Sequence, residues 1–275
     1  MDVFKSIEEI DYGKVKWVDT RFSLNDREEG KRKFAKGHVA GAVYWDLEED
    51  LSDMTKKAGR HPLPDKEKLT ALFRKSGLSL NDDIIVYDDG GSPFAARAWW
   101  LLRYAGFQNA FIAIEGFEQL KASGVPISTE NEIIPPTEVV PVWNETIHAP
   151  RSFIEETVAG KTGAILLDAR SAERYRGVVE PIDRVAGHIP GALNFDWEQL
   201  KLNGSFNLGS EVKDQLEKTV SKSEDIAVYC GSGVTAAPLY ALLKHNGYEH
   251  VKLYVGSFSE WISKADAPVE KTNEL

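Results

Sequence analysis

The single cysteine of the 275-residue chain lies in the segment IAVYCGSGVTAAP, residues 226–238. Cys230 stands where an apolar run ends and a turn with two glycines begins. Those glycines permit backbone conformations in which successive amide groups point at one centre and attract negative charge. The helix expected next adds the N–H groups of its first turn and the positive end of its dipole. Such a setting lowers the pKa of a cysteine thiol, produces a nucleophilic thiolate and would hold a persulfide equally well.

The turn itself supplies the amides that we expect to bind the sulfur and the substrate. They belong to Gly231, Gly233, Val234 and Thr235. A buried structural cysteine is the simplest alternative, but a glycine turn at the end of a strand disfavours it. GSGVTA also fits a loose dinucleotide-binding pattern, yet the acidic residue that such a site needs after the next strand is missing. A cysteine phosphatase is excluded because its loop requires an arginine at the position of Ala236.

The sequence around this turn occurs twice in the chain. GHVAGAVYWDLE (residues 37–48) corresponds to GHIPGALNFDWE (residues 187–198), with matching strand ends upstream, WVDTR and LLDAR. Downstream, IIVYDDGGSPFAARAWWLLRYAGF corresponds to the cysteine segment, and Asp88 stands where the second copy has Cys230. Three matches in the same order indicate a tandem duplication in which only the second copy carries the nucleophile.

Each copy alternates short apolar runs with helical patterns, which predicts βαβ units and a parallel sheet flanked by helices. Ligands of such sheets bind at the C-terminal ends of the strands, where we expect Cys230. A stretch with five prolines separates the copies and is typical of an extended linker. We therefore predict an α/β protein with a first domain over residues 1–128, a linker over 129–148 and a catalytic domain over 149–275.

The composition is that of a globular chain with a net charge of −10 and a pI near 5.2. This charge argues against nucleic acid or an anionic membrane as a partner, whereas a local cluster of arginines can still bind a small anion. No apolar run is long enough to span a membrane, and the N-terminus does not have the pattern of a signal peptide. A lone cysteine cannot form an internal disulfide, so we expect a reducing, cytoplasmic environment. The six histidines lack the spacing of metal ligands, so we expect neither a metal nor another cofactor.

Together these segments resemble the two-domain rhodanese and 3-mercaptopyruvate sulfurtransferase family over nearly the whole chain. The similarity is carried by CGSGVTA, the paired G-H-x-x-G-A segments, RYRGVVEPIDRVAGHIPGA and GSFSEW. It implies two tandem rhodanese-like domains, the first of which forms a wall of the cleft. It also implies a ping-pong reaction in which Cys230 takes the outer sulfur of a small anionic donor as a persulfide. The acceptor that removes this sulfur would be a small thiol, a thioredoxin-like protein or cyanide.

The resemblance also suggests roles for individual residues. Arg174 matches the family's substrate arginine, and Arg184 is a second candidate, although its spacing differs from that of animal relatives. Ser232 would donate a proton to the departing pyruvate, with Glu48 and His61 of the first domain as possible relay partners. Animal relatives carry Asp at the position of Glu48.

Two sulfur donors and one non-catalytic role remain open. Thiosulfate-preferring members typically have basic residues directly after the cysteine, whereas this chain has Gly231 and Ser232, as in relatives that prefer 3-mercaptopyruvate. We therefore expect 3-mercaptopyruvate as the donor, with a thiosulfate:cyanide sulfurtransferase as the alternative. A rhodanese-like module that only docks partners or senses sulfide is a third hypothesis. The presence of the only cysteine in the predicted catalytic loop favours an enzyme.

Overall fold

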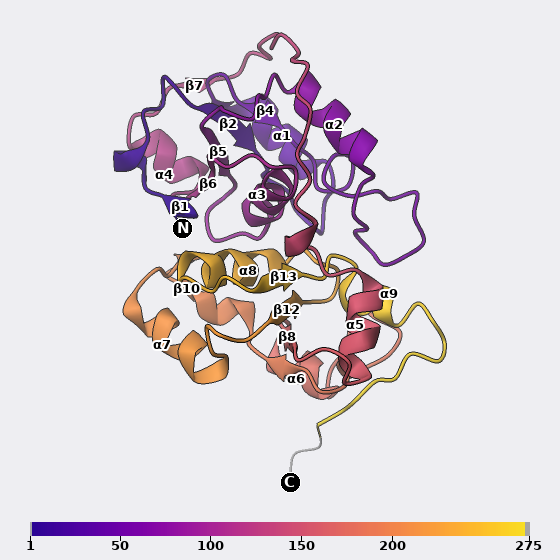
Figure 1. The fold of residues 1–275 in the computed structure, drawn as a ribbon. Coiled ribbons are helices and arrows are strands. Elements are labelled where there is room, and N and C mark those ends of the chain that lie inside the picture. Colours follow the sequence, from indigo (N-terminus) through magenta and orange to yellow (C-terminus); the bar gives the residue numbers. More distant parts are fainter. Residues whose placement is uncertain (1, 273–275) are drawn as a thin grey trace.

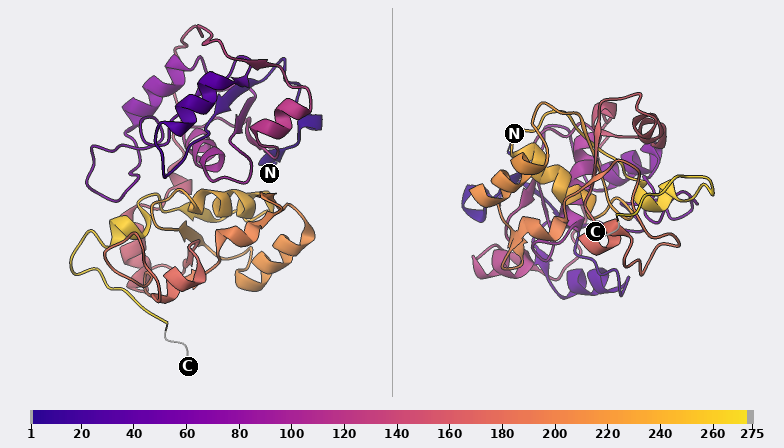
Figure 2. Two further views of the ribbon diagram at one scale, coloured as in Figure 1. Left: turned by 180° about the vertical axis from the view of Figure 1, so that it is seen from behind. Right: turned by 90° about the horizontal axis from the view of Figure 1, so that it is seen from below.

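Short apolar runs form the strands of two separate parallel sheets in the computed structural model, which describes residues 2–272. The first half of the chain lies above the second half in Figure 1. Each sheet has helices on both faces (Figure 2), as the duplicated βαβ pattern predicts. The prediction of an α/β protein with two parallel sheets is confirmed. Within the described residues, no helix combines the length and the apolar character that crossing a bilayer requires.

The first sheet has five strands in the order β1-β6-β5-β2-β4. These are β1 (Phe4–Lys5), β2 (Lys16–Asp19), β4 (Val43–Tyr44), β5 (Ile84–Tyr87) and β6 (Ala110–Ala113). Its helices are α1 (Glu29–Lys36), α2 (Lys66–Lys75), α3 (Phe94–Tyr104) and α4 (Phe117–Ala122). Alternate strand residues face opposite sides of the sheet. Val18 and Val86 pack with α2 and α3, whereas Trp17 and Tyr87 pack with α1 and α4.

The second sheet has four strands in the order β13-β12-β8-β9. These are β8 (Ile165–Asp168), β9 (Leu193–Asn194), β12 (Ile226–Tyr229) and β13 (Val251–Leu253). Its helices are α5 (Arg151–Val158), α6 (Ala172–Arg176), α7 (Ser210–Thr219), α8 (Ala236–His245) and α9 (Ser257–Trp261). Leu167 and Val228 pack with α7 and α8, whereas Ala227 and Tyr229 pack with α5, α6 and α9.

Helices α3 and α8 join the two halves. They pack against each other at the junction (Figure 1), where the ring centroids of Trp99 and Tyr240 are 6.0 Å apart. The largest apolar core therefore runs without interruption from one sheet, through both helices, to the other sheet. Because burial of this shared apolar surface stabilises the junction, residues of the first half are held firmly against loops of the second half.

Short antiparallel ribbons, turns of 3-10 helix and an extended segment complete the fold. The ribbons pair β3 (His38–Val39) with β7 (Ile127–Ser128) and β10 (Lys201–Leu202) with β11 (Ser205–Phe206). The 3-10 helices are η1 (Ile7–Glu9), η2 (Glu145–Ile147) and η3 (Trp197–Leu200). Residues 129–144, which have no helix or strand, run along the first half of the chain. The amides of Val142 and Asn144 donate to the carbonyls of Ala105 and Tyr104 at 3.0 and 2.8 Å.

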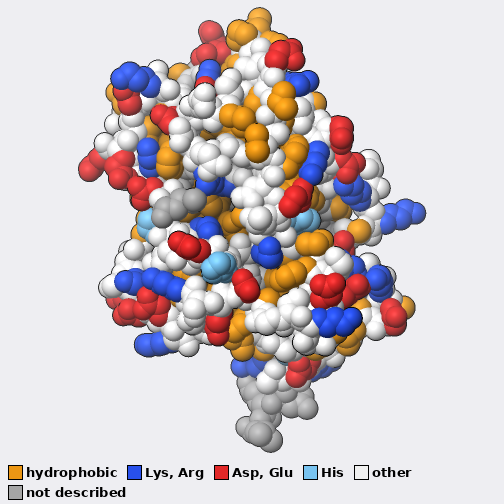
Figure 3. All heavy atoms as spheres, in the orientation of Figure 1, with side chains coloured by type: hydrophobic (Ala, Val, Ile, Leu, Met, Phe, Trp, Pro, Cys, Tyr) orange, Lys and Arg blue, Asp and Glu red, His pale blue; other side chains and the backbone are white. Residues whose placement is uncertain are grey.

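The surface of the molecule carries both signs of charge. On the face shown in Figure 3, acidic and basic side chains are interspersed over both halves. The chain as a whole has a net charge of −10. An anionic ligand therefore needs a local group of cations that outweighs this background at short range.

Candidate active site

Cys230 directly follows β12 and opens the loop that leads into α8. Its Sγ accepts a hydrogen bond from the amide of Gly233 at 3.1 Å. Its own amide donates to the Oγ of the fully buried Ser257 at 3.1 Å, and this Oγ lies 4.0 Å from the sulfur. The sulfur therefore faces an amide and a hydroxyl group, although the residue as a whole is only 1% exposed.

Glycine is required at position 233 of this loop. Gly233 has a φ of +76°, and a Cβ there would overlap with the carbonyl oxygen of Val255. The loop is also tied to the start of α9, because the amides of Phe258 and Ser259 donate to loop carbonyls, each at 2.9 Å. These contacts hold the Gly233 amide on the sulfur.

The remaining amides of the loop have no protein acceptor within residues 2–272. They belong to Gly231, Ser232, Val234 and Thr235. They are available to a bound anion or to the outer sulfur of a persulfide. The last two precede α8 directly, so the dipole of that helix adds positive potential at the same place.

Two guanidinium groups from different halves of the chain lie beside Gly231. Arg174 projects from α6, and Arg60 belongs to the first-half loop that precedes α2. A Cβ at Gly231 would overlap with Nη2 of Arg60 and lie 3.4 Å from Nη2 of Arg174. Both guanidiniums bind Asp183, and Arg174 also donates to Glu180 at 2.8 Å. A pair of cations suited to an anionic group therefore stands next to the catalytic loop.

The guanidinium of Arg184, predicted as the second substrate arginine, lies outside this cluster in the ligand-free structure. Arg184 is exposed, and its guanidinium donates to the carbonyl of Ile262. The side chain of Asp183 is buried, whereas the adjacent Arg184 is exposed. The second guanidinium beside Gly231 is that of Arg60.

His61 links the first half of the chain to the catalytic loop. Its Nδ1 lies 2.9 Å from Oγ of Ser232, and its Nε2 lies 3.9 Å from Oε1 of Glu48. The first distance is that of a hydrogen bond, whereas the second is longer than one. The carboxylate of Glu48 is held by Arg27 at 2.9 Å. The structure thus brings the three residues expected for a proton relay together as neighbours.

His61 is neutral at physiological pH. Burial, reinforced by nearby arginines, lowers its pKa to about 4. A neutral imidazole has one donor nitrogen and one acceptor nitrogen. With the proton on Nε2, the side that faces Glu48, Nδ1 accepts a hydrogen bond from the hydroxyl of Ser232. In this tautomer His61 is able to take up a proton through Ser232.

Arg97 of α3 is a completely buried cation behind the loop. Its guanidinium donates to the carbonyl oxygens of Gly233, Leu51 and His61 at 3.4, 3.1 and 3.4 Å. Burial lowers the pKa of Arg97 to about 10, and negative charge on Cys230 opposes that shift. Arg97 therefore ties the catalytic loop to the loop that carries His61, and a thiolate would partly compensate its buried charge.

A cavity of about 640 Å³ is lined by Glu48, Arg60, His61 and Ser232 of this group. Most of its walls belong to the first half of the chain, while Ile182 and Ser232 contribute from the second half. Three apolar side chains of its lining, Leu24, Met54 and Ile182, are 59%, 43% and 60% exposed. A small ligand therefore reaches Ser232 through a cleft between the two halves.

Both halves match one known family, because the model of the rhodanese-like domain fits residues 6–123 and residues 154–264. The chain belongs to the rhodanese-like family. A Mycobacterium tuberculosis protein with the name "Putative thiosulfate sulfurtransferase SseB" is 38% identical over 259 residues, which cover 93% of this chain and 90% of that protein. A Pseudomonas aeruginosa protein named "Probable 3-mercaptopyruvate sulfurtransferase" is 36% identical, covering 92% of this chain and 90% of that one. The solved structure of SseA from Escherichia coli, described as a 3-mercaptopyruvate sulfotransferase with the rhodanese fold, is also similar. It matches with a TM-score of 0.81 at 30% sequence identity, and the match covers 94% of this chain and 100% of that chain.

The first rhodanese-like domain repeats the loop without the nucleophile. Asp88 follows β5 as the cysteine follows β12, and its carboxylate accepts from the amides of Gly90 and Ala95 at 2.8 and 3.0 Å. Burial raises the pKa of Asp88 to about 7. A Cβ at Gly91 would overlap with the carbonyl oxygen of Gly204, at the tip of the β10–β11 ribbon. The second domain therefore covers this loop closely.

Sequence reasoning missed three residues of this rhodanese-like site, namely Arg60, Arg97 and Asp183. Arg60 directly precedes His61, which the sequence predicts as a relay residue. Its place next to that residue is the sequence signal that could have identified Arg60. Arg97 has only apolar neighbours on both sides within the helical pattern FAARAWWLLRY, which indicates a buried role. Asp183 lies in a charged segment, and no sequence signal distinguishes it from Arg184 as the residue that points inward.

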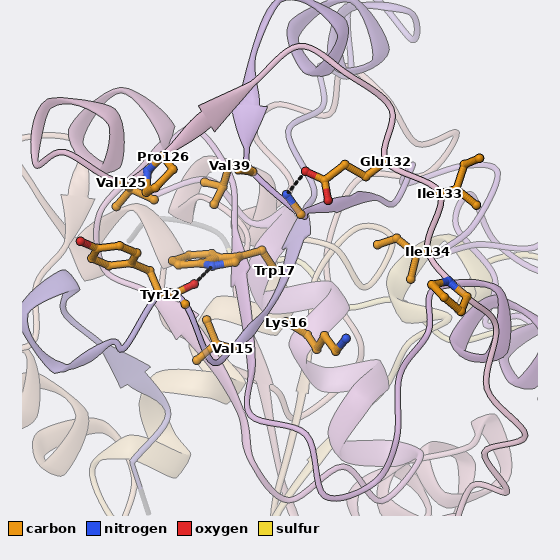
Figure 4. A pocket seen from close by; sticks show the side chains of 14 residues that line it. Tyr12, Val15, Lys16, Trp17, Val39, Val125, Pro126, Glu132, Ile133 and Ile134 are labelled. Atoms are coloured by element: carbon orange, nitrogen blue, oxygen red, sulfur yellow. Dashed lines mark hydrogen bonds between the residues drawn. The ribbon is translucent and has the colours of Figure 1, made fainter.

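A second cavity, of about 570 Å³, lies on the first domain between residues 12–17 and residues 125–135 (Figure 4). There the indole of Trp17 donates to the carbonyl of Tyr12 at 3.3 Å, and the amide of Gly41 donates to Glu132 at 3.1 Å. These polar groups are thus paired with one another, and the lining contains neither cysteine nor histidine. The part of the chain that the structure describes also has no cluster of three His, Cys, Asp or Glu side chains suited to a metal ion. We therefore place the candidate active site at the loop after β12.

Proposed function

We propose that this protein is a sulfurtransferase that moves sulfur from 3-mercaptopyruvate to an acceptor through a persulfide on Cys230. The observation that carries the choice of donor is the pair of guanidiniums, from Arg60 and Arg174, beside Gly231. Because Gly231 has no side chain, these guanidiniums occupy the space where thiosulfate-preferring relatives have a basic loop residue. Two guanidiniums suit a carboxylate, which 3-mercaptopyruvate carries and thiosulfate lacks.

The reaction begins with the thiolate of Cys230. It attacks the sulfur of the donor, the carbon–sulfur bond breaks, and the electron pair of that bond forms the enolate of pyruvate. The new sulfur–sulfur bond makes a persulfide, whose outer sulfur the free amides of the loop stabilise. In the second half-reaction an acceptor thiolate or cyanide attacks the outer sulfur and restores the thiolate of Cys230.

Ser232 and His61 have a defined task with 3-mercaptopyruvate. The thiol proton of the donor has to leave the sulfur, and the enolate carbon has to gain a proton to become the methyl group of pyruvate. The hydrogen bond of 2.9 Å between Ser232 and neutral His61 supports a relay that moves this proton. Thiosulfate releases sulfite without any such proton transfer, so the relay favours 3-mercaptopyruvate.

Transfer from thiosulfate to cyanide through the same cysteine is the second candidate function. It is supported by the Mycobacterium tuberculosis relative, which is named for thiosulfate, whereas the Pseudomonas aeruginosa relative is named for 3-mercaptopyruvate. In both reactions Cys230 would carry the same persulfide. The two candidates therefore differ in how the donor is bound and in whether the relay is used.

The acceptor would be a small thiol, a thiol on a thioredoxin-like protein, or cyanide. The exposed apolar side chains at the cavity, Leu24, Met54 and Ile182, support a protein acceptor, because a small anionic donor makes little use of them. A catalytic thiolate also needs reducing surroundings, which supports a cytoplasmic location. The reaction as written requires no cofactor.

A comparison of the two donors tests the proposal. We expect a gain of one sulfur atom in the mass of the intact protein after exposure to donor, and a higher kcat/KM with 3-mercaptopyruvate than with thiosulfate. A preference for thiosulfate of about tenfold or more would overturn the choice of donor. If neither donor adds sulfur, the docking or sulfide-sensing hypothesis is the one that survives.

Arg174→Ala and Arg184→Ala form a matched pair for the substrate site. Arg174→Ala should raise the KM for 3-mercaptopyruvate about 10- to 100-fold, because it removes charge-assisted hydrogen bonds to the carboxylate. Persulfide formation at saturating donor should be retained. Arg184→Ala should leave the KM unchanged, since that side chain contacts Ile262 at the surface. An unchanged KM in Arg174→Ala would remove Arg174 from the site.

A further inference from the structure

The carboxylate of Asp183 joins two arginines, one from each domain, that lie beside the catalytic loop. Its Oδ1 accepts from Nη1 of Arg60, in the first domain, and its Oδ2 accepts from Nη2 of Arg174 at 3.1 Å. The side chain of Asp183 is only 4% exposed. A carboxylate held between two guanidiniums beside the catalytic loop has the contacts that the carboxylate of the proposed donor would need.

Asp183 is held less firmly than its neighbour Glu180. Glu180 accepts three hydrogen bonds from Arg174 and two more from the amides of Ile182 and Asp183, at 3.1 and 3.0 Å. The carboxylate of Asp183, among residues 2–272, accepts from the two arginines alone. The segment that carries it has no helix or strand, and the adjacent Ile182 is 60% exposed. Asp183 is therefore the carboxylate that an entering anion displaces more easily.

We infer that Asp183 is an internal competitor for the anionic group of the donor and so determines which ligands enter and how readily. In the ligand-free state it binds Arg174 alongside Glu180 and holds Arg60 over Gly231, next to a cysteine that is 1% exposed. An anionic donor that replaces Asp183 keeps both guanidiniums paired and opens the ion pair that joins the domains. A neutral ligand cannot make this exchange, because it would leave the partly buried guanidinium of Arg60 without its carboxylate, while Arg174 would keep only Glu180.

Asp183 touches no reacting atom in this scheme and is a positioning residue that acts through the two arginines. The inference rests on the proposed function for the identity of the donor. The competition itself requires only an entering anion. A test that uses a simple anionic reagent therefore separates the role of Asp183 from the question of which donor is used.

Alkylation of the cysteine provides this test, because the chain contains only one. Iodoacetate carries a carboxylate and iodoacetamide is its neutral counterpart, so the ratio of their second-order rates reports how well the pocket admits an anion. We expect this ratio to rise roughly five- to tenfold in Asp183→Asn, because an internal carboxylate no longer competes. The KM for 3-mercaptopyruvate should fall by a similar factor while kcat changes less.

Three further variants make the result decisive. Asp183→Ser also lacks the carboxylate and should repeat the rise, whereas Asp183→Glu keeps it and should retain the wild-type ratio. Asp26→Asn removes the same charge from an exposed pair with Arg32 and should change nothing. An unchanged or lower ratio in both the Asn and Ser variants would overturn the inference, and a lower one would mean that Asp183 holds the arginines ready for the donor. If the choice of donor is wrong, the alkylation ratio still rises and only the KM result is lost.

Discussion

The loops after β5 and β12 are two copies of one turn that hold different acidic groups. In the first loop the carboxylate of Asp88 accepts from the amides of Gly90 and Ala95 at 2.8 and 3.0 Å. In the second loop the sulfur of Cys230 accepts from the amide of Gly233 at 3.1 Å. Both turns therefore offer backbone amides to an acidic group. The fold therefore places backbone amides around the same position in both loops. Whether the loop can react depends on the residue at that position, an aspartate in the first loop and a cysteine in the second.

The two loops differ more in what faces them across the domain junction. The first loop meets the tip of the β10–β11 ribbon, where the carbonyl of Gly204 fills the space over Gly91. The second loop meets Arg60 and His61 and a cavity of about 640 Å³. Each domain thus covers the loop of the other, but only the first domain does so with a guanidinium and an imidazole, the groups to which we assign anion binding and proton transfer. In our proposal the first domain therefore supplies part of the active site.

A buried Asp–Arg ion pair occurs at the same place in both domains, and in the second domain it is connected to the arginine beside the catalytic loop. Arg21 and Arg170 each bind the aspartate two residues earlier, and each donates to a glycine carbonyl of the paired G-H-x-x-G-A segments at 2.7 Å. Arg170 also contacts Glu180 at 3.3 Å, and Glu180 in turn holds Arg174. The buried ion pair of Arg170 is thereby connected through Glu180 to Arg174 beside the catalytic loop.

The largest expected effect comes from exchanging the reacting residues of the two loops. Cys230→Ser should abolish transfer from both donors, because no other sulfur in the chain can become a thiolate. Adding Asp88→Cys to this variant should not restore transfer, since the ribbon covers the first loop and no arginine pair faces it. Activity assays with both donors, and the mass of the intact protein, check the result. Persulfide on the new cysteine would show that the surroundings matter less than we argue.

The proton relay should separate the two donors. Ser232→Ala and His61→Gln should lower kcat with 3-mercaptopyruvate by about 10²- to 10⁴-fold, and kcat with thiosulfate far less, because only the first reaction moves a proton. Since burial lowers the pKa of His61 to about 4, the wild-type kcat should not fall near pH 6.5 and should fall as the pH approaches 4 and His61 becomes protonated. Equal losses with both donors would mean that these residues only support the loop.

Gly91 and Gly233 occupy the same position in the two loops, so alanine variants at both distinguish an effect on stability from an effect on catalysis. A Cβ would overlap with Val255 in Gly233→Ala and with Gly204 in Gly91→Ala, and both positions have positive φ. Each variant should lose about 3–5 kcal/mol of unfolding free energy. Gly247→Ala, which also has positive φ but open space around it, should lose clearly less. Only Gly233→Ala should slow persulfide formation in the protein that remains folded, so equal slowing in Gly91→Ala would contradict the division between the loops.

The tandem fold and the family were predictable because their signals are local and repeated. The two G-H-x-x-G-A segments and the CGSGVTA turn occupy consecutive positions, and their turn chemistry determines the backbone without help from distant residues. The predictions of two α/β domains and of the rhodanese-like family are confirmed. The roles of Cys230, Ser232 and the loop amides stay predictions, which the structure supports by placing them together.

The arginine cluster could not be predicted in full because it depends on packing between domains. Arg60 reaches Gly231 only because α3 packs on α8, and no local pattern encodes that contact. The position of Arg184 outside the cluster could not be predicted for a different reason. The segment around Asp183 has neither helical nor strand periodicity, so the sequence does not indicate which side chain faces inward.

The smallest expected effect concerns the stability of the first loop. Burial raises the pKa of Asp88 to about 7, so between pH 4 and pH 7 the folded protein keeps a proton that the unfolded chain releases. The contribution of Asp88 to stability is therefore complete at acidic pH and is lost as the pH rises through about 7. Between pH 5 and pH 7 this loss should reach about 2 kcal/mol. Denaturant unfolding of wild type and Asp88→Asn at each pH measures it, because the other titrating groups are the same in both proteins and cancel in the difference. Asp89→Asn, at a half-exposed neighbour paired with Lys33, should keep the wild-type slope. If Asp88→Asn also keeps that slope, the carboxyl of Asp88 is ionised throughout this range, and the amides of its loop bind the charge strongly enough to outweigh burial.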